Sequence, residues 1–317
     1  MKDGQEVPIK HPPTVSSPFV REVFAAMTLP RTAQGAVDLE VFARHLEFVL
    51  RAGVKGFVLN GATGEYCLTS CDELSQILRR AREVTGPGVK LLAAIGGASL
   101  TQTLCRLDVA EAAGADMLLL PMPYFFPYEQ QDLIAFSKHV AQRASLPLLL
   151  YNLPEFTTAL EPSTTLELLS EIPKIKGIKD SSGSLKTVRL LTALRPKANR
   201  VIGSDGALYE ALVEGVCDGV VSGVASVLPE LMQALYRAAE ESPLGETALG
   251  LNASLEEFLG WLRRFPVPWG LKIIAAERGF SAADFPLPMS PQRTAEGLQF
   301  VEWFRAHRSM LLADATL

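Results

Sequence analysis

Eight short apolar segments alternate with amphipathic segments between residues 23 and 222, and this alternation constrains the fold more than any other feature. The apolar segments are Val23–Thr28, Gly56–Asn60, Lys90–Ile95, Met117–Pro121, Pro147–Tyr151, Ile175–Lys179, Arg200–Gly203 and Gly219–Ser222. The amphipathic segments have helical period and are Leu39–Ala52, Cys71–Val84, Leu100–Ala113, Gln131–Ala144, Ser163–Ser170, Leu185–Leu194 and Ala207–Glu214. Apolar runs without a polar face are typical of strands buried on both sides in a parallel sheet. Strict alternation of this kind predicts an α/β fold, a closed (β/α)8 TIM barrel. An open doubly wound sheet is the alternative, but no GxGxxG motif follows the first segment.

The pattern changes after Ser222, where helical segments follow one another without strands between them. These segments are Leu228–Glu241, Leu251–Arg264, Trp269–Arg278 and Pro291–Ala306. The first is expected to complete the barrel and the others to form a C-terminal helical extension that contains all three tryptophans. The predicted organisation is therefore an N-terminal tail over 1–18, a barrel over 19–240 and the extension over 241–317.

Composition narrows the class of protein. Hydrophobic residues make up 48% of the chain, the formal net charge is −5, and no run of lysine and arginine supplies the basic surface that nucleic acids require. No segment approaches the ~20 apolar residues of a membrane span, and Met1–Ser17 has no apolar core typical of a signal peptide. The sequence thus predicts a cytoplasmic protein. The four cysteines, Cys67, Cys71, Cys105 and Cys217, are expected to be buried or partly buried free thiols without zinc.

Polar side chains gather where the predicted strands end, which in such barrels is where active sites lie. The strand ends with reactive groups are Asn60–Glu65, Tyr151–Pro154, Gly177–Gly183, Gly203–Gly206 and Val221–Gly223. The four histidines, His11, His45, His139 and His307, fall instead in the tail or on predicted helices, where surface or packing roles are expected.

Lys179 is the centre of this group of strand ends. Alternation along its strand puts Ile175, Gly177 and Lys179 on one face, so Lys179 points into the barrel if Ile175 does. A free lysine amine can attack a carbonyl and form a Schiff base, and Tyr151 on the preceding strand could move the proton this requires. A surface lysine and a packing tyrosine are the plain alternatives. The glycines around Thr63 let backbone N–H groups approach a ligand carboxylate, although an ordinary turn would look the same.

Taken together, these residues resemble the family of dihydrodipicolinate synthase and N-acetylneuraminate lyase. The resemblance runs from about Val23 to Tyr236 and rests on Thr28-Leu29-Pro30, Gly61-Ala62-Thr63-Gly64-Glu65, Leu68, Glu73, Pro123-Tyr124, Tyr151-Asn152-Leu153-Pro154 and Gly177-Ile178-Lys179-Asp180. It implies a homo-oligomer, tetramer or dimer, that forms a covalent Schiff base with pyruvate or a related 2-oxo acid and needs no metal or organic cofactor. Lys179 would be the Schiff-base lysine and Tyr151 the proton-transfer tyrosine. Thr63, with Gly61, Ala62 and Gly64, would hold the 2-oxo acid carboxylate.

Three departures from the family pattern bear on the second substrate. The synthase usually has a hydroxyl residue where this chain has Ala62, a tyrosine reaching from a neighbouring subunit at Phe125, and a carboxylate-binding arginine at Phe156. The ring of Phe156 is expected to be buried, and a buried phenyl ring cannot pair with a carboxylate, so these changes argue against the synthase. In the sugar-acid lyases, residues matching Gly203, Asp205, Val221 and Ser222 lie near the hydroxylated tail of the substrate. Asp205 could instead cap the following helix.

The sequence therefore predicts a class I lyase that makes or breaks a carbon–carbon bond between pyruvate and an aldehyde, with a 2-keto-3-deoxy sugar acid as the expected substrate. Phe125, Phe126 and Phe156 could instead favour a less polar aldehyde. A dehydratase using the same imine is the nearest alternative, and a barrel that only binds a 2-oxo acid is the alternative from another class. The expected partners are small molecules and further copies of the chain, without nucleic acid or membrane.

Overall fold

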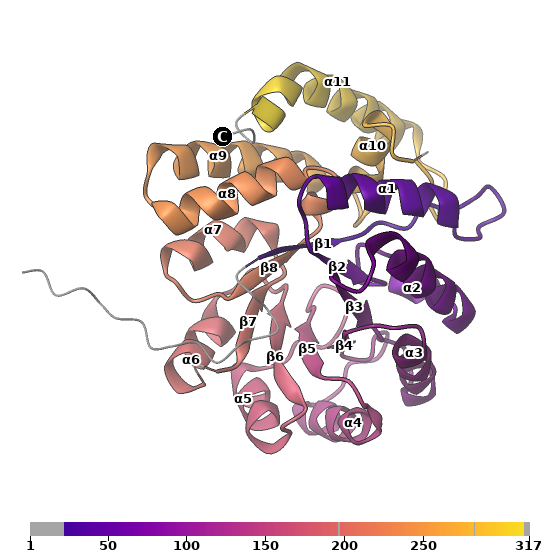
Figure 1. The fold of residues 1–317 in the computed structure, drawn as a ribbon, viewed down its shortest axis with the longest axis vertical. Coiled ribbons are helices and arrows are strands. Elements are labelled where there is room, and N and C mark those ends of the chain that lie inside the picture. Colours follow the sequence, from indigo (N-terminus) through magenta and orange to yellow (C-terminus); the bar gives the residue numbers. More distant parts are fainter. Residues whose placement is uncertain (1–21, 196, 282, 314–317) are drawn as a thin grey trace, which may run out of the picture.

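The computed structural model describes residues 22–195, 197–281 and 283–313. Eight parallel strands close into a barrel in the order of the sequence, as Figure 1 shows from one end. They are β1 (Val23–Ala26), β2 (Gly56–Leu59), β3 (Lys90–Ala94), β4 (Met117–Pro121), β5 (Leu148–Asn152), β6 (Ile175–Asp180), β7 (Asn199–Ile202) and β8 (Gly219–Ser222). β1 pairs with β8, which closes the ring. The predicted (β/α)8 barrel is confirmed, and every predicted strand is found within two residues of its predicted bounds.

A helix follows each strand and packs outside the barrel (Figure 1). These helices are α1 (Leu39–Arg51), α2 (Cys71–Thr85), α3 (Leu100–Ala112), α4 (Gln130–Arg143), α5 (Pro162–Glu171), α6 (Lys186–Leu194), α7 (Asp205–Val213) and α8 (Pro229–Glu241). Side-chain caps fix several of their starts. Ser70 and Glu73 form a reciprocal capping box at α2, and Asp38 accepts from the backbone N–H of Val41 at α1.

The strand side chains pack in two separate cores because alternate residues face opposite sides of the sheet. On β5, Leu148 and Leu150 face the helices, whereas Leu149 and Tyr151 face the interior of the barrel. Phe24, Val58 and further apolar side chains fill the interior beneath Tyr151. The barrel is therefore a packed core whose polar chemistry is confined to the carboxyl ends of its strands, here called the barrel mouth.

The alternation breaks within β6, which corrects one step of the sequence argument. Leu148 pairs with Ile175, but Leu150 pairs with Ile178, so β6 has one residue more than β5 over this stretch. Ile175 and Ile178 consequently both face the helices, and Ile175 does not share a face with Lys179. The strands also approach closely here, because a Cβ on Gly177 would lie 2.1 Å from the backbone oxygen of Asn199. The bulge, rather than simple alternation, accounts for the inward direction of Lys179.

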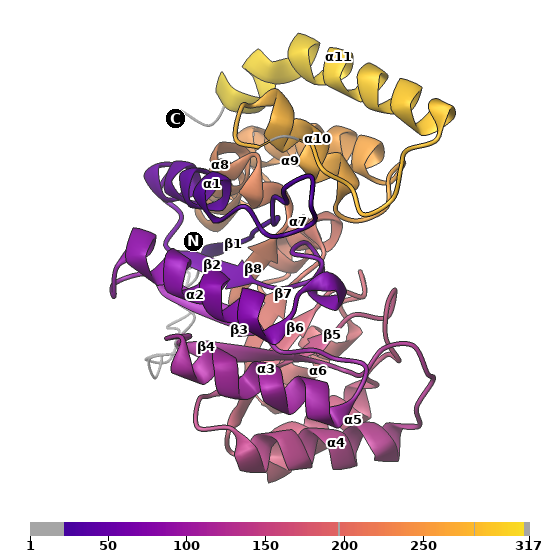
Figure 2. The ribbon, with the colours of Figure 1, turned by 90° about the vertical axis from the view of Figure 1, so that its right-hand side faces the viewer.

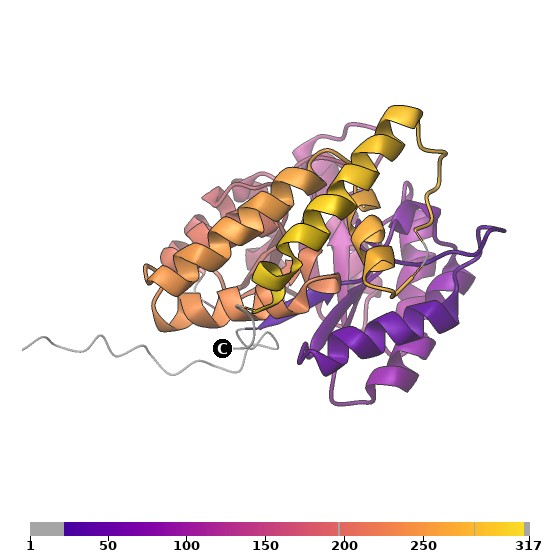
Figure 3. The same ribbon diagram turned by 90° about the horizontal axis from the view of Figure 1, so that it is seen from above.

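Three further helices form the C-terminal part of the chain, beyond the strand–helix units (Figure 2). They are α9 (Glu246–Leu262), α10 (Trp269–Glu277) and α11 (Pro291–Ala313). Figure 3 shows α11 lying across the outside of the preceding helices. Trp261 stacks on Phe300 at 5.4 Å between ring centroids, which joins α9 to α11. In the described part of the chain, no helix is both long and apolar enough to cross a membrane.

Two parts of the predicted organisation have no structural test. The tail over 1–18, with His11, lies outside the described residues. The division between barrel and extension at 240 stays a prediction, although α8 ends at Glu241, next to that position.

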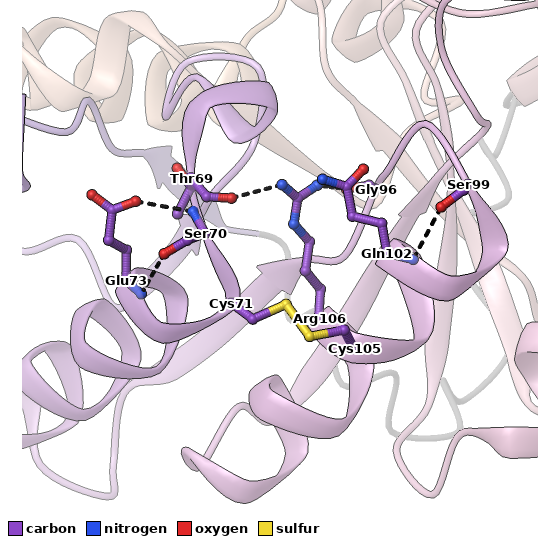
Figure 4. The surroundings of a disulfide bond; sticks show 9 residues. All are labelled: Thr69, Ser70, Cys71, Glu73, Gly96, Ser99, Gln102, Cys105 and Arg106. Atoms are coloured by element: carbon purple, nitrogen blue, oxygen red, sulfur yellow. Dashed lines mark hydrogen bonds between the residues drawn. A yellow bond between two sulfur atoms is a disulfide. The ribbon is translucent and has the colours of Figure 1, made fainter.

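A disulfide between Cys71 and Cys105 corrects the expectation of four free thiols (Figure 4). Cys71 is the first residue of α2 and Cys105 lies in α3, and their Cα atoms are 6.5 Å apart. The two helices are neighbours around the barrel, so packing brings together cysteines that are 34 residues apart in sequence. Neither Cys67 nor Cys217 is part of a disulfide, and Cys67 is exposed rather than buried.

The buried side chain of His45 on α1 should make the stability of the fold depend on pH. It is fully buried, its Nε2–H donates to the carbonyl of Ser226 at 2.6 Å, and burial lowers its pKa from 6.5 to about 4. Between these values the unfolded chain binds a proton that the folded chain does not. The free energy of unfolding should therefore fall by about 3 kcal/mol as the pH drops from about 6.5 to 4. Urea titrations of native protein and His45→Gln at several pH values would measure this.

The matched control is His139→Gln, because His139 is exposed on α4. This variant should keep the pH dependence of the native chain, whereas His45→Gln should lose most of it between pH 4 and 6.5. Equal pH dependence in native protein and His45→Gln would contradict the assignment.

Candidate active site

Lys179 and Tyr151 face each other inside the barrel mouth. They occupy paired positions on neighbouring strands, because Tyr151 of β5 is in register with Lys179 of β6. Lys179 Nζ lies 3.9 Å from the centroid of the Tyr151 ring. Only 3% of Lys179 and 2% of Tyr151 are exposed, so the surface-lysine alternative is wrong. The structure thus brings together the two residues that the sequence singled out for imine chemistry and proton transfer.

Gly203 leaves room for the lysine side chain. It follows β7, and a Cβ at this position would lie 2.8 Å from Lys179 Cε and 2.1 Å from the Ser181 hydroxyl. A larger residue would force the lysine to shift. The glycine expected near the substrate tail therefore lies directly against the predicted nucleophile.

The Gly61–Glu65 loop lies beside the end of β8. Thr63 is buried, and its hydroxyl would lie 3.4 Å from a Cβ on Gly223. The same Cβ would be 3.9 Å from a carboxylate oxygen of Asp205. Gly64 packs on the backbone of Asn60, where a Cβ would meet the Asn60 nitrogen at 3.2 Å. Thr63 and Asp205 are far apart in sequence, but both lie next to Gly223.

Asp205 is the first residue of α7, and the preceding Ser204 takes the capping position. Asp205 Oδ2 accepts from the backbone N–H of Val224 at 3.2 Å, so the carboxylate joins the start of α7 to the segment after β8. Burial raises the pKa of Asp205, although hydrogen bonds from Ser222 and Val224 and the charge of Lys179 oppose this. Ser222 and Val221 are themselves buried at the end of β8. The alternative of a helix-capping aspartate is not what the structure has.

A buried ion cluster anchors Glu65, the last residue of the Gly61–Glu65 loop. This cluster was not predicted from the sequence. Lys272 of α10 bonds Glu65 at 2.5 Å and Asp284 at 2.9 Å. The exposed fractions of the Lys272 and Glu65 side chains are 2% and 6%. Glu65 has a left-handed backbone with φ of 52°, which is uncommon for residues other than glycine. A lysine within the otherwise apolar stretch from Trp269 to Ala276 was the available sequence signal.

Two further tyrosines, Tyr66 and Tyr124, lie beside the Lys179–Tyr151 pair. Neither was assigned a role from the sequence. Tyr66, directly after the Gly61–Glu65 loop, is 4% exposed and packs in the barrel interior with Tyr151. Its ring meets the edge of Tyr124 at 5.6 Å between centroids. Burial raises the pKa of Tyr66 well above its usual range, and the neighbouring Tyr151 adds to this. Tyr66 therefore stays a neutral hydrogen-bond donor at ordinary pH.

Arg106 lies near these tyrosines and joins two backbone segments, and Figure 4 shows its bonds to Gly96 and Thr69. Its guanidinium donates to the carbonyl of Gly96, after β3, and to that of Thr69, before α2, at 2.7 Å for the latter. Burial lowers the pKa of Arg106. An arginine on the buried stripe of α3 was the signal that could have found it.

The phenylalanines at the mouth are exposed, which corrects the expectation of a buried apolar ring at position 156. Phe125, Phe126 and Phe156 are exposed by 82%, 59% and 42%. Phe125 has a φ of 86° in the turn after β4, and the neighbouring Tyr124 forms a bridge with Thr157 that joins this turn to the loop after β5. The ring that replaces the family arginine thus lies at the rim.

Within the described residues, histidine, cysteine and acidic side chains form no group of three with the arrangement of a metal site. The ionisable groups that meet at the mouth are Lys179, Asp205, Tyr151 and Tyr66. This set suits nucleophilic and proton-transfer chemistry.

Comparison with known proteins agrees with this architecture. The sequence model of the Dihydrodipicolinate synthetase family matches residues 19–306. A 4-hydroxy-tetrahydrodipicolinate synthase of Herminiimonas arsenicoxydans is 31% identical over 86% of this chain and 93% of its own. An uncharacterized DapA-like lyase of Halobacterium salinarum is 30% identical over 81% and 84%. Dihydrodipicolinate synthase of Acinetobacter baumannii complexed with pyruvate has a TM-score of 0.82 and 28% identity, covering 94% of this chain and 99% of its own.

Proposed function

The chain belongs to the dihydrodipicolinate synthetase family of lyases, and from that premise we propose that it cleaves or forms a carbon–carbon bond between pyruvate and an aldehyde, with a 2-keto-3-deoxy sugar acid as substrate. One observation carries the proposal: the buried Lys179 amine lies 3.9 Å from the ring centroid of Tyr151 at the mouth of the barrel. A buried amine next to a phenol supplies both the nucleophile and the proton carrier that an imine mechanism needs.

The proposed reaction proceeds through an imine. The Lys179 amine adds to C2 of the 2-oxo acid, and loss of water gives a protonated imine. Removal of the proton from the C4 hydroxyl breaks the C3–C4 bond. The electron pair moves into the imine, so the aldehyde leaves and an enamine remains. Protonation at C3 and hydrolysis release pyruvate and restore the amine. Because the imine is the electron sink, these steps call for no metal or organic cofactor.

Tyr151 and Thr63 have distinct proposed roles. Tyr151 would move the proton between the substrate hydroxyl and the carbinolamine, since it is the phenol in contact with Lys179. Thr63 and the backbone of Gly61–Gly64 would hold the carboxylate of the 2-oxo acid. The proximity of Thr63 to Gly223, and so to Asp205, supports a site whose carboxylate end and hydroxylated end are close together.

The choice of a sugar acid rests on the far end of the site. Asp205 is partly buried, and one of its oxygens already accepts from the backbone N–H of Val224. A carboxylate accepts well from vicinal hydroxyls, and Ser222 lies beside it. Position 156, by contrast, carries a phenyl ring at the rim, where a second carboxylate would find no cation from that side chain. These contacts favour a polyhydroxylated tail over an acidic one.

The second candidate is the synthase reaction, and the names of the curated relatives favour it. The two candidates share the pyruvate imine and differ in the aldehyde, so assays with each aldehyde separate them. Pyruvate release from 2-keto-3-deoxygluconate and 2-keto-3-deoxygalactonate, followed with a coupled reductase, is the expected activity. Condensation of pyruvate with aspartate semialdehyde as the faster reaction would replace the sugar acid with the synthase substrate. A keto-deoxy acid that loses water without releasing pyruvate would identify a dehydratase.

Tyr151→Phe removes the proposed proton carrier and little else. The phenyl ring can keep the packing against Lys179, so imine formation with pyruvate should still be trapped by borohydride. Turnover should fall by about 10²- to 10⁴-fold, the usual contribution of a general acid–base group. Steady-state kinetics and intact mass after trapping would measure the two effects.

The control for this variant is Tyr209→Phe, because Tyr209 on α7 donates to the backbone of Pro243 rather than facing the mouth. Its turnover should stay near the native value. If Tyr151→Phe retained native turnover, another group would have to carry the proton.

We further propose that the chain acts as a homo-oligomer. Phe125 and Phe126 are exposed and stack edge to face at 4.8 Å, an arrangement that a second copy could cover. Sedimentation velocity of the native chain and of Phe125→Asp would test this, with dissociation of the variant as the expected result.

A further inference from the structure

Asn152 and Asp180 form a buried hydrogen-bonded pair directly behind the proposed catalytic residues. Asn152 follows Tyr151 on β5, Asp180 follows Lys179 on β6, and the two are in register. Asn152 Nδ2 donates to Asp180 Oδ1 at 3.1 Å. Their exposed fractions are 4% and 3%. Because successive strand residues face opposite sides, this pair lies on the helix side of the sheet while Tyr151 and Lys179 lie inside.

The pair also ties down the loops that follow both strands. The Asn152 side-chain oxygen accepts from the backbone N–H of Leu160 at 3.0 Å, eight residues along the chain. Asp180 Oδ1 accepts a second bond, from the backbone N–H of Ser182 at 2.9 Å. Both the nitrogen and the oxygen of the Asn152 side-chain amide are thus hydrogen-bonded. The Asp180 carboxylate joins β6 to β5 and to the turn at Ser182.

The register of these two strands needs such a lock. The bulge between Ile175 and Ile178 interrupts the ladder only a few residues before Lys179. A further shift of one residue would turn Lys179 toward the helices and remove it from Tyr151. Side-chain hydrogen bonds at the last register position oppose that shift, because they are satisfied only in the observed pairing.

We propose that Asn152 and Asp180 are positioning residues that hold Lys179 against Tyr151. The proposal rests on the proposed function for its kinetic consequence, but the geometric claim stands apart from the identity of the substrate. The pair would act on the chemical step, which depends on the Lys179–Tyr151 arrangement. It would act little on substrate affinity, which in the proposed function depends on Thr63 and Asp205, at the ends of other strands.

Asn152→Asp tests the lock most directly. It sets two buried carboxylates face to face where an amide now donates, so the strand ends must separate. A misplacement near 1 Å between reacting groups costs on the order of 10²-fold in turnover. We therefore expect kcat per folded chain to fall about 100-fold, with a much smaller change in KM for the 2-oxo acid.

The double variant Asn152→Asp/Asp180→Asn provides the rescue. The carboxylate at position 152 can accept from Leu160 and from the new amide at position 180, whose oxygen can accept from Ser182. Each native bond then has a counterpart, and only the bond between positions 152 and 180 exchanges its donor and acceptor. Recovery of kcat to within about tenfold of native is the expected result, since the register is again locked.

Asp116→Asn is the matched control at the opposite end of the barrel. Asp116 accepts from the backbone of Leu91 and bonds Arg82 at 2.8 Å, away from the mouth. This variant should lower the thermal midpoint without changing kcat per folded chain. It separates a general loss of stability from a loss of active-site geometry.

The experiment measures kcat, KM and thermal midpoint for the four variant chains and native protein, adding Asp180→Asn as the fourth. Crystal structures of native protein and Asn152→Asp report the distance from Lys179 Nζ to the Tyr151 ring, which should lengthen in the variant whichever substrate the enzyme uses. A low kcat for Asn152→Asp that the double variant restores would support the proposal. It would be overturned by an Asn152→Asp chain with native kcat, or by a double variant that regains the midpoint but not kcat. If Asn152→Asp does not fold, the double variant still decides, because a folded double variant with kcat far below the native value would overturn the proposal. Absence of a pyruvate adduct on native protein would count against the proposed function alone.

Discussion

Replacing Lys179 by methionine is expected to abolish turnover and the covalent pyruvate adduct together. The amine is the only part of the side chain that can form the imine, and no later step proceeds without it. Loss of a covalent nucleophile costs on the order of 10⁴-fold or more in turnover. Methionine keeps an unbranched apolar stem of similar length, and Lys179 is only 3% exposed, so the fold should be preserved.

The measurement is intact mass after borohydride reduction in the presence of pyruvate. Native protein should gain one reduced pyruvyl group per chain, which peptide mapping should locate on Lys179. Lys176→Met is the control, because Lys176 lies on the same strand but is exposed and donates to the carbonyl of Pro173. An adduct that persisted on Lys179→Met would place the chemistry on another lysine.

Among the variants considered, Lys272→Met should lower the free energy of unfolding the most. The variant leaves Glu65 and Asp284 facing each other without their shared cation in a site where Glu65 is 6% exposed. Removing one member of a buried ion cluster usually costs about 3–5 kcal/mol, because the remaining charge cannot be solvated. The free energy of unfolding from urea titration should fall by that amount. Because Glu65 ends the loop that carries Thr63, KM for the 2-oxo acid should rise as well.

Lys138→Met controls for the loss of a lysine ion pair as such. Lys138 bonds Glu171 at 2.7 Å, but both side chains are exposed, by 41% and 50%. Its removal should leave the urea midpoint nearly unchanged, since exposed pairs contribute little. A Lys272→Met chain as stable as native protein would show that Glu65 and Asp284 are neutral or solvated, and the electrostatic account of the loop would fail.

The barrel could be predicted from the sequence because each strand and helix carries its own local pattern. Segments such as Met117–Pro121 and Gly219–Ser222 appear in the structure with the predicted bounds. The site followed from the same pattern, since parallel strands bring their carboxyl ends to one edge. Lys179 and Tyr151 could therefore be paired before any coordinates were known, although the reason given for the direction of Lys179 was wrong.

Contacts between distant segments could not be predicted in this way. Lys272 and Glu65 are 207 residues apart, and nothing near either residue indicates the other. The Cys71–Cys105 disulfide depends on how α2 and α3 pack. The roles of Arg106 and Tyr66 likewise depend on contacts with residues from other strands and helices, which the sequence around each of them does not indicate.

The sequence by itself determined the strand–helix alternation, and with it the edge of the barrel where reactive side chains collect. These properties depend on periodicity and on local backbone preference, which each segment carries independently of the rest. The tertiary structure alone decided that a bulge in β6 turns Lys179 inward, that Asn152 and Asp180 lock the paired strand ends, and that α10 anchors the loop of Thr63. Such features depend on strand register and on the burial of charge, and both quantities exist only once distant parts of the chain are in contact.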